Sequence, residues 1–462
     1  MPAGITAMDA DAPAGRGSVA PAGPAPEDTN PERAAESSNV LATVRSVFSL
    51  LASYGLLLLA NGMFGTLLGV RSQIEGFETQ VVGLIMAAYF LGLLLGAMRA
   101  GNVVAAVGHI RAFAVFASVM SVAALLHVMV VDPLLWCVLR FASGFCMAGM
   151  ILVTESWLNA RSTNRTRGQV MALYMVTNYF SAGCGQFLLT AADPARFELF
   201  SVASIIFSLA LLPVLLTQAT APKPPERDPL NLRDLWRTSP LGLVGSLCAG
   251  LVNASFFSLA PVFAIGLGMS IASTSTFMAS VIFGGLLLQY PVGHLSDRVD
   301  RRTVLALVSI ATSSACVAIV MVSRIDAHWI YVAGVFYGGL SFTVYSLCAA
   351  HANDFASPDK LVQTASGLLT AYGLGAFIGP IIASTCMTWL GPPGLFVWSA
   401  LASGVLGVFA VYRMRRRGAP GEQQRSRVIS LPGGQFTSGQ LYASMRNAMD
   451  RDLAHMSGQR RR

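Results

Sequence analysis

One arginine lies inside an otherwise apolar segment, where its side chain could bind a negatively charged group. Arg140 stands about six residues into the apolar run 134–155, a depth of about 9 Å at the helical rise of 1.5 Å per residue. If that run crosses a membrane, a guanidinium at this depth is costly and ordinarily faces a cavity or a partner. Two structural alternatives stay open: an Arg that extends toward the membrane surface, and an Arg bonded to backbone carbonyls.

The densest charge outside the two ends of the chain lies in residues 293–302, which read GHLSDRVDRR. Apolar runs flank this segment on both sides, so it must lie at the water interface, and its positive excess predicts the cytoplasmic side. Its charged residues are Asp297, Arg298, Asp300, Arg301 and Arg302. Taken alone, such a segment is equally typical of a solvated turn in any multi-span protein.

Uncharged polar side chains lie at membrane depth in several other runs. Asn61, Asn178, Asn253 and Tyr345 are candidates to line a cavity with Arg140, although each could instead bond a neighbouring helix. No Asp or Glu lies in the middle of any run. A single Arg in a neutral polar cavity favours an anionic or zwitterionic small organic solute over the cations of multidrug efflux.

The composition decides what class of protein holds these residues. Hydrophobic residues make up 54% of the chain and charged residues 12%, with a mean hydropathy of +0.60. A soluble domain carries about twice that charge fraction, so the chain is an integral protein of a lipid bilayer. The formal charge of +8 does not predict nucleic-acid binding, because the Arg residues lie in loops and a tail.

The sequence has no pattern for catalysis or for a cofactor. All seven cysteines fall in apolar runs without a Cys-x-x-Cys pair, so we expect reduced packing residues rather than disulfides or metal ligands. Neither a nucleotide-binding loop nor a nucleophile arrangement is present, which disfavours ATP-driven transport and enzyme activity. We expect no metal and no cofactor.

Twelve apolar runs organise the chain, and each is long enough to cross a hydrocarbon core of about 30 Å as a helix. They cover residues 46–68, 79–100, 111–131, 134–155, 167–190, 197–217, 241–265, 272–292, 303–323, 328–350, 363–387 and 394–412. We predict a disordered leader over 1–40, a first six-helix half over 41–217, a linker over 218–239, a second half over 240–413 and a basic tail over 414–462. Apolar residues at helical spacing over 441–453 suggest a short amphipathic helix in that tail.

Positive residues alternate between the loops and predict the orientation. One set of loops holds twelve Arg and Lys residues, among them Arg111 and Lys360, whereas the other set holds only Arg71, Arg196 and Arg324. The rich side faces the cytoplasm, so we expect both termini to be cytoplasmic.

The two predicted halves repeat one another at an offset near 193 residues. Asn61 matches Asn253 at an offset of 192, residues 90–95 match 283–288 at 193, and Gly144 matches Gly339 at 195. Three successive matches at a nearly constant offset indicate two pseudo-symmetric halves in the same orientation.

Segment 293–302 resembles, in its letters and in its position after the eighth run, the signature loop of the major facilitator superfamily. The resemblance covers about residues 45–415, and the YcaD-like branch of bacterial inner-membrane carriers is the most similar, on ESWLN from Glu155, YPVG from Tyr290 and HAND from His351. It implies an all-α membrane protein of twelve transmembrane helices in two pseudo-symmetric six-helix halves, placed in the bacterial inner membrane. We expect a monomer.

The same resemblance implies a cytoplasmic gate in the second half. Gly293 would let two helices approach closely, and Asp297 would face the N-terminus of a helix in the opposite half. Arg301 or Arg302 would bind Asp354 at the end of the tenth run. These contacts would close the cytoplasmic face and break when it opens; the alternative is that the charges only mark topology.

In the first half the expected charges are less complete. Loop 101–111 has Ala105, or Val104 if the repeat offset is used, where the signature has Asp. Arg111 could still meet Glu155. The residues Leu139, Arg140 and Gly144 resemble the fourth-helix motif of the superfamily, whose Arg is associated with proton-linked transport. Protons are therefore a candidate coupling ion.

Two classes of function follow from these features. The first is a secondary carrier of a small organic solute, in which two halves rock around a site near the membrane midplane. The second is a membrane sensor or assembly partner with a carrier fold, acting through its leader and tail. A carrier needs Asp297 and tolerates loss of the tail, and a sensor shows the reverse.

Overall fold

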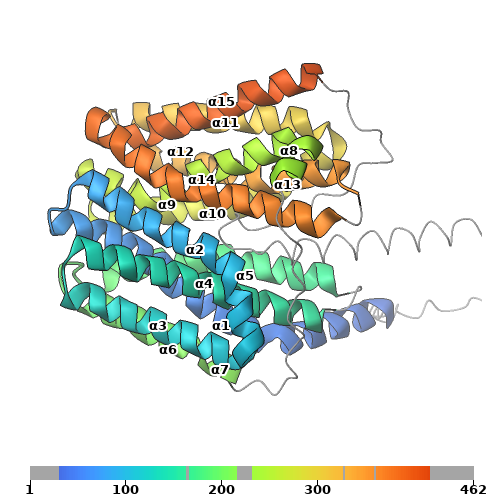
Figure 1. The fold of residues 1–462 in the computed structure, drawn as a ribbon, viewed down its shortest axis with the longest axis horizontal. Coiled ribbons are helices and arrows are strands. Elements are labelled where there is room, and N and C mark those ends of the chain that lie inside the picture. The colour runs from blue at the N-terminus through green and yellow to red at the C-terminus, as the bar shows by residue number, and fades with distance from the viewer. Residues whose placement is uncertain (1–30, 163–165, 216–231, 326–327, 358–359, 417–462) are drawn as a thin grey trace, which may run out of the picture. The chain divides into compact units, whose positions relative to one another are not determined.

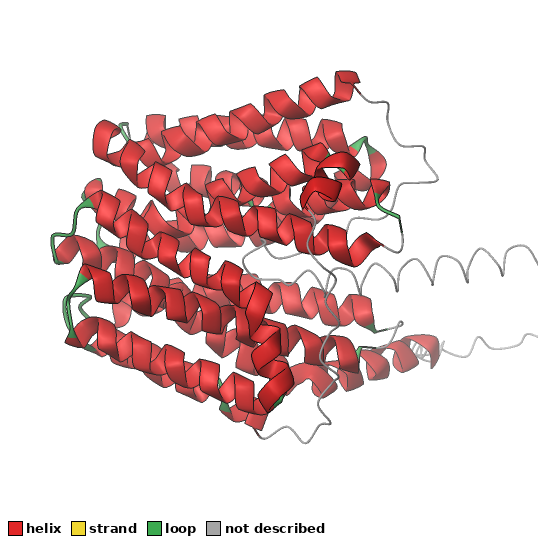
Figure 2. Cartoon of the chain, viewed as in Figure 1, coloured by secondary structure: helices red, strands yellow, loops and turns green. Residues whose placement is uncertain are grey.

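A computed structural model describes residues 31–162, 166–215, 232–325, 328–357 and 360–416, with the backbone alone for 31–46 and Val362. Every regular element in these ranges is a helix (Figures 1 and 2). In chain order they are α1 (Pro31–Ile74), α2 (Thr79–Val107), α3 (His109–Met129), α4 (Pro133–Arg161), α5 (Arg167–Phe187), η1 (Leu188–Ala191), α6 (Glu198–Leu209), α7 (Leu212–Leu215), α8 (Leu232–Thr238), α9 (Pro240–Gly266), α10 (Ile271–Arg298), α11 (Arg301–Val322), α12 (Trp329–Ser341), α13 (Thr343–Phe355), α14 (Leu361–Leu390) and α15 (Gly394–Arg416). The chain divides into two compact units, Met1–Ala42 and Thr43–Arg462, and the site lies in the second.

Eleven segments of the described chain are long and apolar enough to cross a membrane. The twelfth predicted run is α5 with η1, and α5 alone has 21 residues. Its Asn178 and Gln186 lower the mean hydropathy of the helix, and both side chains are buried within the protein. The all-α, twelve-helix architecture predicted from the sequence is therefore confirmed.

Most connections between the long helices are short within the described residues, and the helices that they join run in opposite directions. Gly76 and Gly108, at two of these reversals, have φ of 73° and 87°, a conformation that glycine adopts without steric cost. We call the two ends of the bundle the far face and the tail face. The far face carries Gly76, Asp132, Gly268 and Gly391, and the tail face carries Gly108, Ser162, Val299 and Ala356.

Two sets of helices form the body of the second unit. In the first half α2 packs on α4 and α3 on α6, and in the second half α9 packs on α14, α10 on α12 and α11 on α15. The halves meet where α2 packs on α14 and α5 on α10. Figure 1 shows the blue to green helices of the first half beside the yellow to red helices of the second.

Glycines permit the closest helix crossing of the first half. A Cβ on Gly92 of α2 would collide with the Phe141 carbonyl oxygen of α4, and a Cβ on Gly144 would collide with that of Tyr89. Such small residues let membrane helices approach until their backbones touch. The crossing places the middle of α2 directly against the segment of α4 that carries Arg140.

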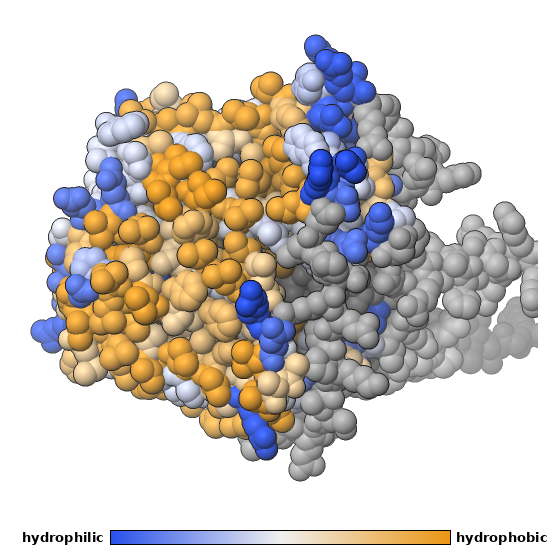
Figure 3. Space-filling model, in the orientation of Figure 1, coloured by the Kyte–Doolittle hydropathy of each residue, from blue (hydrophilic) through white to orange (hydrophobic). Residues whose placement is uncertain are grey.

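Apolar side chains cover much of the lateral surface, as the orange area of Figure 3 shows. On α3, Val115 and Val122 are 53% and 55% exposed, and on α15 Leu401, Val405 and Val408 are 60–71% exposed. A continuous apolar surface of this kind is costly in water and suits a lipid bilayer.

Three elements differ from the predicted boundaries. Helix α1 begins at Pro31, inside the expected leader 1–40, because Pro at the first position and good helix formers after it extend the membrane helix backwards. The run 328–350 is broken at Phe342 into α12 and α13, and α8 is an additional helix inside the linker. The amphipathic helix expected at 441–453 lies outside the described residues.

Candidate solute-binding cavity and charged gate

A cavity of about 570 Å³, open solvent included, lies between the two halves. Helices α1, α2, α4 and α5 contribute one side of it, and α9 and α10 the other. Its lining residues are Leu58, Asn61, Gly62, Gly65, Thr66, Met86, Tyr89, Phe90, Arg140, Ala182, Gln186, Phe257, Ser258, Met278 and Ile282.

Arg140 supplies the positive charge of this cavity. Its residue is 4% exposed, and its guanidinium carbon lies 4.1 Å from the centre of the Tyr89 ring. The Nε and Nη1 atoms are buried and have no hydrogen-bond partner within the described part of the chain. The aromatic contact offsets some of the cost of burying the charge, but two donors remain for an anion. Arg140 therefore lines a cavity in this structure, and its role in binding a solute stays a prediction.

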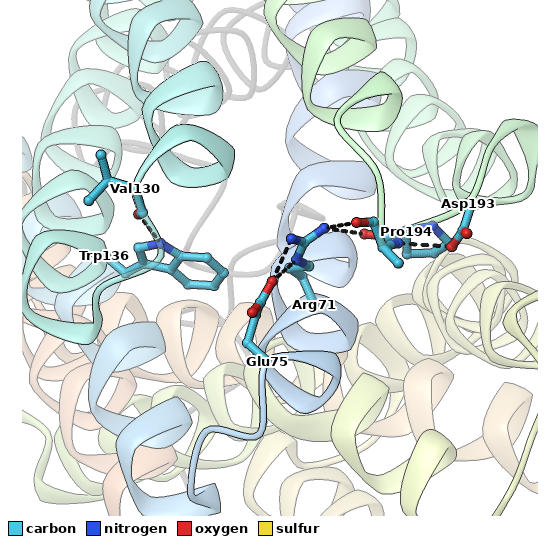
Figure 4. Close-up of polar contacts among 7 residues, drawn as sticks. Arg71, Glu75, Val130, Trp136, Asp193 and Pro194 are labelled. Atoms are coloured by element: carbon cyan, nitrogen blue, oxygen red, sulfur yellow. Dashed lines mark hydrogen bonds and ion pairs between the residues drawn. The ribbon is translucent and has the colours of Figure 1, made fainter.

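The residues at the start of α4 fix the end of the helix that carries Arg140. Asp132 caps the helix by accepting a hydrogen bond from the Leu135 backbone N–H at 2.8 Å, and Pro133 occupies the first turn. The indole N–H of Trp136 donates to the Val130 carbonyl at 3.1 Å (Figure 4). The preceding loop is therefore fixed at the far face.

The end of α1 is also fixed at the far face. Arg71 donates to Glu75 Oε1 at 2.5 Å and to the Pro194 carbonyl at 3.2 Å, and it also bonds the Ala195 carbonyl (Figure 4). Asp193 accepts from the Ala195 N–H at 2.9 Å. One arginine therefore ties α1 to the connection between α5 and α6.

Neutral polar groups complete the first-half side of the cavity. The Tyr89 hydroxyl donates to Asn61 Oδ1 at 3.4 Å. The Thr66 hydroxyl donates to Gln186 Oε1 at 2.6 Å, and Gln186 Nε2 donates to the Gly62 carbonyl at 3.0 Å. These bonds fix the amides that a ligand would meet beside the guanidinium.

The second half contributes an apolar wall with one hydroxyl. Phe257, Met278 and Ile282 present hydrophobic side chains, and Ser258 presents a buried hydroxyl without a hydrogen-bond partner in the described residues. The cavity is thus polar and positive on one side and apolar on the other. The described lining includes no Asp or Glu.

Three of the predicted cavity residues do not line it. Asn178 donates to the Tyr54 hydroxyl at 2.7 Å inside the first half, and Tyr345 packs edge-on against Tyr372, with ring centres 5.2 Å apart. Asn253 is 1% exposed, and its amide atoms have no hydrogen-bond partner among the described residues. The internal repeat therefore predicts the cavity position of Asn61 but not that of Asn253, because the helices of the two halves pack differently around these amides.

Several lining residues were not predicted. They lie in the far-face halves of their helices, where a polar residue is common because it is close to water. These residues are Thr66, Tyr89, Gln186 and Ser258. The sequence offered one signal for these residues, which is their depth below the far face. Gln186 and Arg140 both lie within about 10 residues of a far-face loop, so they could be expected at a similar depth.

The predicted contact between Arg301 and Asp354 is present. Nη1 of Arg301 lies 2.7 Å from Asp354 Oδ1, with 3% and 1% of the side chains exposed, and it also donates to the Ala350 carbonyl at 2.9 Å. Asp297, four residues earlier at the end of α10, lies 3.5 Å from Arg301. The contact of Asp297 with a helix N-terminus in the opposite half stays a prediction.

The other residues of this loop take different places. Arg302 pairs with Asp300 at 2.7 Å rather than with Asp354, because Asp300 caps α11 and accepts from the Arg302 N–H at 3.0 Å. Gly293 is buried in α10, and Arg298 is exposed at its end. The gate cluster in the second half therefore consists of Asp297, Arg301 and Asp354.

The pairing of Arg111 with Glu155 was predicted wrongly. Arg111 is exposed at the start of α3 and makes no ion pair within the described ranges. Glu155 is 2% exposed and accepts a hydrogen bond from the Tyr174 hydroxyl at 2.7 Å. A hydroxyl from α5 thus serves the carboxylate that the loop arginine was expected to meet.

Metal chemistry has no support from the described residues. No group of three or more His, Cys, Asp or Glu side chains there could hold a metal ion, and all seven cysteines are free thiols.

The fold and the site together define a polytopic membrane carrier. The family model of the Major Facilitator Superfamily matches residues 50–373 and 284–444, and the chain belongs to this family. The predicted resemblance is thereby confirmed, and the chain is a member of a family of transporters.

Similar proteins agree on the branch and on the fold. An uncharacterized MFS-type transporter of Yersinia pestis (strain Pestoides F) is 28% identical over 82% of this chain and 97% of its own. The uncharacterized MFS-type transporter YcaD of Escherichia coli O17:K52:H18 is 28% identical over 78% of this chain and 93% of its own. Among solved structures, the nucleoside transporter NupG has a TM-score of 0.67 at 12% identity, covering 80% of this chain and 99% of that one. The D-xylose-proton symporter has a TM-score of 0.62 at 12% identity, covering 82% and 99%.

Proposed function

We propose that the protein is a secondary active carrier that moves a small organic anion across the inner membrane by alternating access. The observation that carries this proposal is Arg140, a buried guanidinium with two unpartnered donors in a cavity shared by both halves. A membrane protein retains such a charge where a ligand or a partner compensates it. The planar fork of an arginine holds a carboxylate with two hydrogen bonds.

The cavity lining favours a monocarboxylate over a zwitterion. No Asp or Glu among the described lining residues could hold an ammonium group, whereas Asn61 and Tyr89 stand beside the guanidinium. Phe257, Met278 and Ile282 face the opposite side and suit an apolar body. The same lack of carboxylates disfavours multidrug cation efflux.

Alternating access requires contacts between the halves that can break. The Tyr179 hydroxyl of α5 donates to Gln289 Oε1 of α10 at 3.1 Å, and Gln289 Nε2 donates to the Ser346 hydroxyl at 3.0 Å. Nearer the far face, a Cβ on Gly83 of α2 would collide with the Ser384 side chain of α14. We propose that the contact of Gly83 with Ser384 separates when the cavity opens to the far face. The Tyr179–Gln289 bond lies on the tail-face side of the cavity, and it separates together with the gate of Asp297, Arg301 and Asp354 when the cavity opens to the tail face.

Coupling to protons is part of this proposal, supported by the resemblance of Leu139, Arg140 and Gly144 to the fourth-helix motif. The alternative is a sensor or assembly partner, and the cavity that both halves line favours transport over it. We retain the expectation of a monomer.

A ligand screen tests the proposal before any substrate is known. The purified protein would be heated in the presence of single small organic acids, amines and sugars, with the Arg140→Gln variant as the control. We expect thermal stabilisation by one or more monocarboxylates in the wild type and none in Arg140→Gln. Stabilisation of both proteins by the same acid would contradict an anion site at Arg140.

The proposed orientation places both termini and the tail face in the cytoplasm. A reporter that is active only in the cytoplasm should give signal when fused after Gly418. The same reporter inserted between residues 191 and 196, at the far face, should give none. The reverse pair of results would overturn the orientation inferred from the loop charges.

A further inference from the structure

A second cavity lies at the tail face of the second half, apart from the Arg140 cavity. It has about 270 Å³ of empty space, open solvent included. The starts of α9 and α11 and the ends of α13 and α15 surround it, which places it where four helices meet. Its lining residues are Ser239, Pro240, Leu241, Arg302, His351, Phe355 and Arg413.

This cavity is basic. Arg302 and His351 are 6% and 5% exposed, and the lining contains no acidic residue. Asp300, behind the lining, fixes the Arg302 guanidinium with contacts of 2.7 Å at Nη2 and 3.1 Å at Nε. Arg413 is half-buried and makes no hydrogen bond or ion pair with any residue that the structure describes. One guanidinium of the cavity therefore lacks an anion.

The start of α9 adds a second source of positive potential. Pro240 is its first residue, and Ser239 caps it by accepting from the Gly242 N–H at 3.2 Å. This helix has 27 residues, and its dipole places a partial positive charge at this end. A helix N-terminus beside an arginine and a histidine is a favourable site for a phosphate group.

We infer that this cavity binds the phosphate of an anionic phospholipid from the leaflet at the tail face. Exposed apolar and aromatic residues near the cavity favour a lipid over a soluble phosphate. Next to Arg413, Tyr412 is 49% exposed, and one turn earlier Val408 is 71% exposed. On α8, Trp236 is 50% exposed. Exposed aromatic residues beside a basic cavity are typical of the membrane interface and of lipid headgroup recognition.

The lipid would act on the gate through two shared elements. Arg302 of the cavity follows Arg301 of the gate, and His351 stands one turn before Asp354 on α13. A phosphate bound here stabilises the ends of α11 and α13 in the arrangement that holds the Arg301–Asp354 pair. The inference goes beyond the proposed solute transport and does not depend on it.

Lipid binding to the full chain in detergent tests this inference. Phosphatidylglycerol, phosphatidylcholine and soluble glycerol phosphate would be titrated separately, with thermal stability and retained lipid by native mass spectrometry as readouts. We expect phosphatidylglycerol alone to bind and stabilise the protein. Arg413→Gln should weaken its binding about tenfold, the loss of one charge-assisted hydrogen bond.

Two matched variants separate the site from general surface charge. Arg413→Lys should keep most of the affinity, and Arg415→Gln, an exposed residue of the same helix, should leave it unchanged. If Arg413→Gln is poorly folded, Arg413→Met keeps the apolar stem and gives the same test. Equal phosphatidylglycerol binding by wild type, Arg413→Gln and Arg413→Met would overturn the site, and equal stabilisation by glycerol phosphate would overturn its lipid source.

Discussion

At the scale of single residues, burial separates the charges that hold the structure from those that mark a surface. The Arg301–Asp354 pair is almost fully buried at 2.7 Å, whereas Asp297 keeps 28% of its side chain exposed at 3.5 Å from the same guanidinium. Loss of one partner of a buried pair leaves the other charge without compensation. A half-exposed partner is screened by water and contributes little.

We therefore expect Asp354→Asn to lower the free energy of unfolding by about 3 kcal/mol. Asp297→Asn, which removes the same charge from a more exposed position, should cost at most about 1 kcal/mol. Thermal or denaturant unfolding of the purified variants in one detergent measures both. A larger loss for Asp297→Asn would mean that Asp297 carries the gate, as the sequence resemblance implied.

The sequence predicted residues whose charge is costly to bury in a membrane, and it missed neutral polar residues, whose burial costs less. Arg140 and Asp354 could be identified because a charge beside or inside an apolar run needs a reason. Gln186, Thr66 and Ser258 could not, because an amide or hydroxyl at the end of a helix is satisfied equally well by water. Asn253 was misplaced because helix packing, rather than the repeat, decides which way an amide points.

At the scale of elements, the crossing of α2 and α4 positions the cavity cation. Gly144 lies one turn after Arg140, and its hydrogen occupies the space that a methyl group would need beside the Tyr89 carbonyl. The same approach brings the Tyr89 ring to 4.1 Å from the Arg140 guanidinium. The repeat pattern matched Gly144 to Gly339, but it could not indicate which helix Gly144 touches.

Gly144→Ala should separate the two helices and lower the free energy of unfolding by about 2 kcal/mol, the usual cost of overpacking. Gly168→Ala is the matched control, because a Cβ there meets nothing within 4 Å. It should cause no loss of stability. Unfolding of both variants gives the comparison, and equal stability of the two would contradict a tight crossing at Gly144.

Some helix boundaries depend on tertiary contacts, which the spacing of apolar residues along the sequence does not predict. Phe342 interrupts the tenth run, and its ring stacks on Phe257 with centres 5.4 Å apart and on Tyr179 at 6.4 Å. Helix α5 has a low mean hydropathy for a membrane helix because it contains Asn178 and Gln186. These side chains are tolerated there because they form hydrogen bonds within the protein. Twelve runs could thus be counted from the sequence, while the break and the contacts could not.

At the scale of the whole molecule, a hydrogen bond joins the two halves within the described residues. The Tyr179 hydroxyl of α5 donates to Gln289 of α10, beside the close approach of Gly183 to the Phe283 ring. Such a bond biases the equilibrium between two arrangements by its net free energy, about 1 kcal/mol. This bond therefore shifts the populations of the two conformations of the carrier, and it contributes little to the stability of the fold.

Tyr179→Phe should weaken the arrangement seen here about fivefold, since 1 kcal/mol corresponds to that factor. A cysteine introduced at Ser258, in a background without native cysteines, would report the change. Its labelling by an impermeant reagent from the tail face should rise, because the Tyr179–Gln289 bond lies on the tail-face side of the cavity. The control is Tyr54→Phe, which removes hydrogen bonds inside one half and should leave labelling unchanged; a rise in the control instead would refute the bias.

The central claim is that the molecule carries an organic anion by means of the Arg140 guanidinium. Its most direct test is counterflow in proteoliposomes with an acid identified by the ligand screen, comparing wild type, Arg140→Lys and Arg140→Gln. We expect Arg140→Gln to abolish counterflow while folding normally, and Arg140→Lys to lose most of it, because an ammonium lacks the planar fork. Full counterflow by Arg140→Gln would contradict the account.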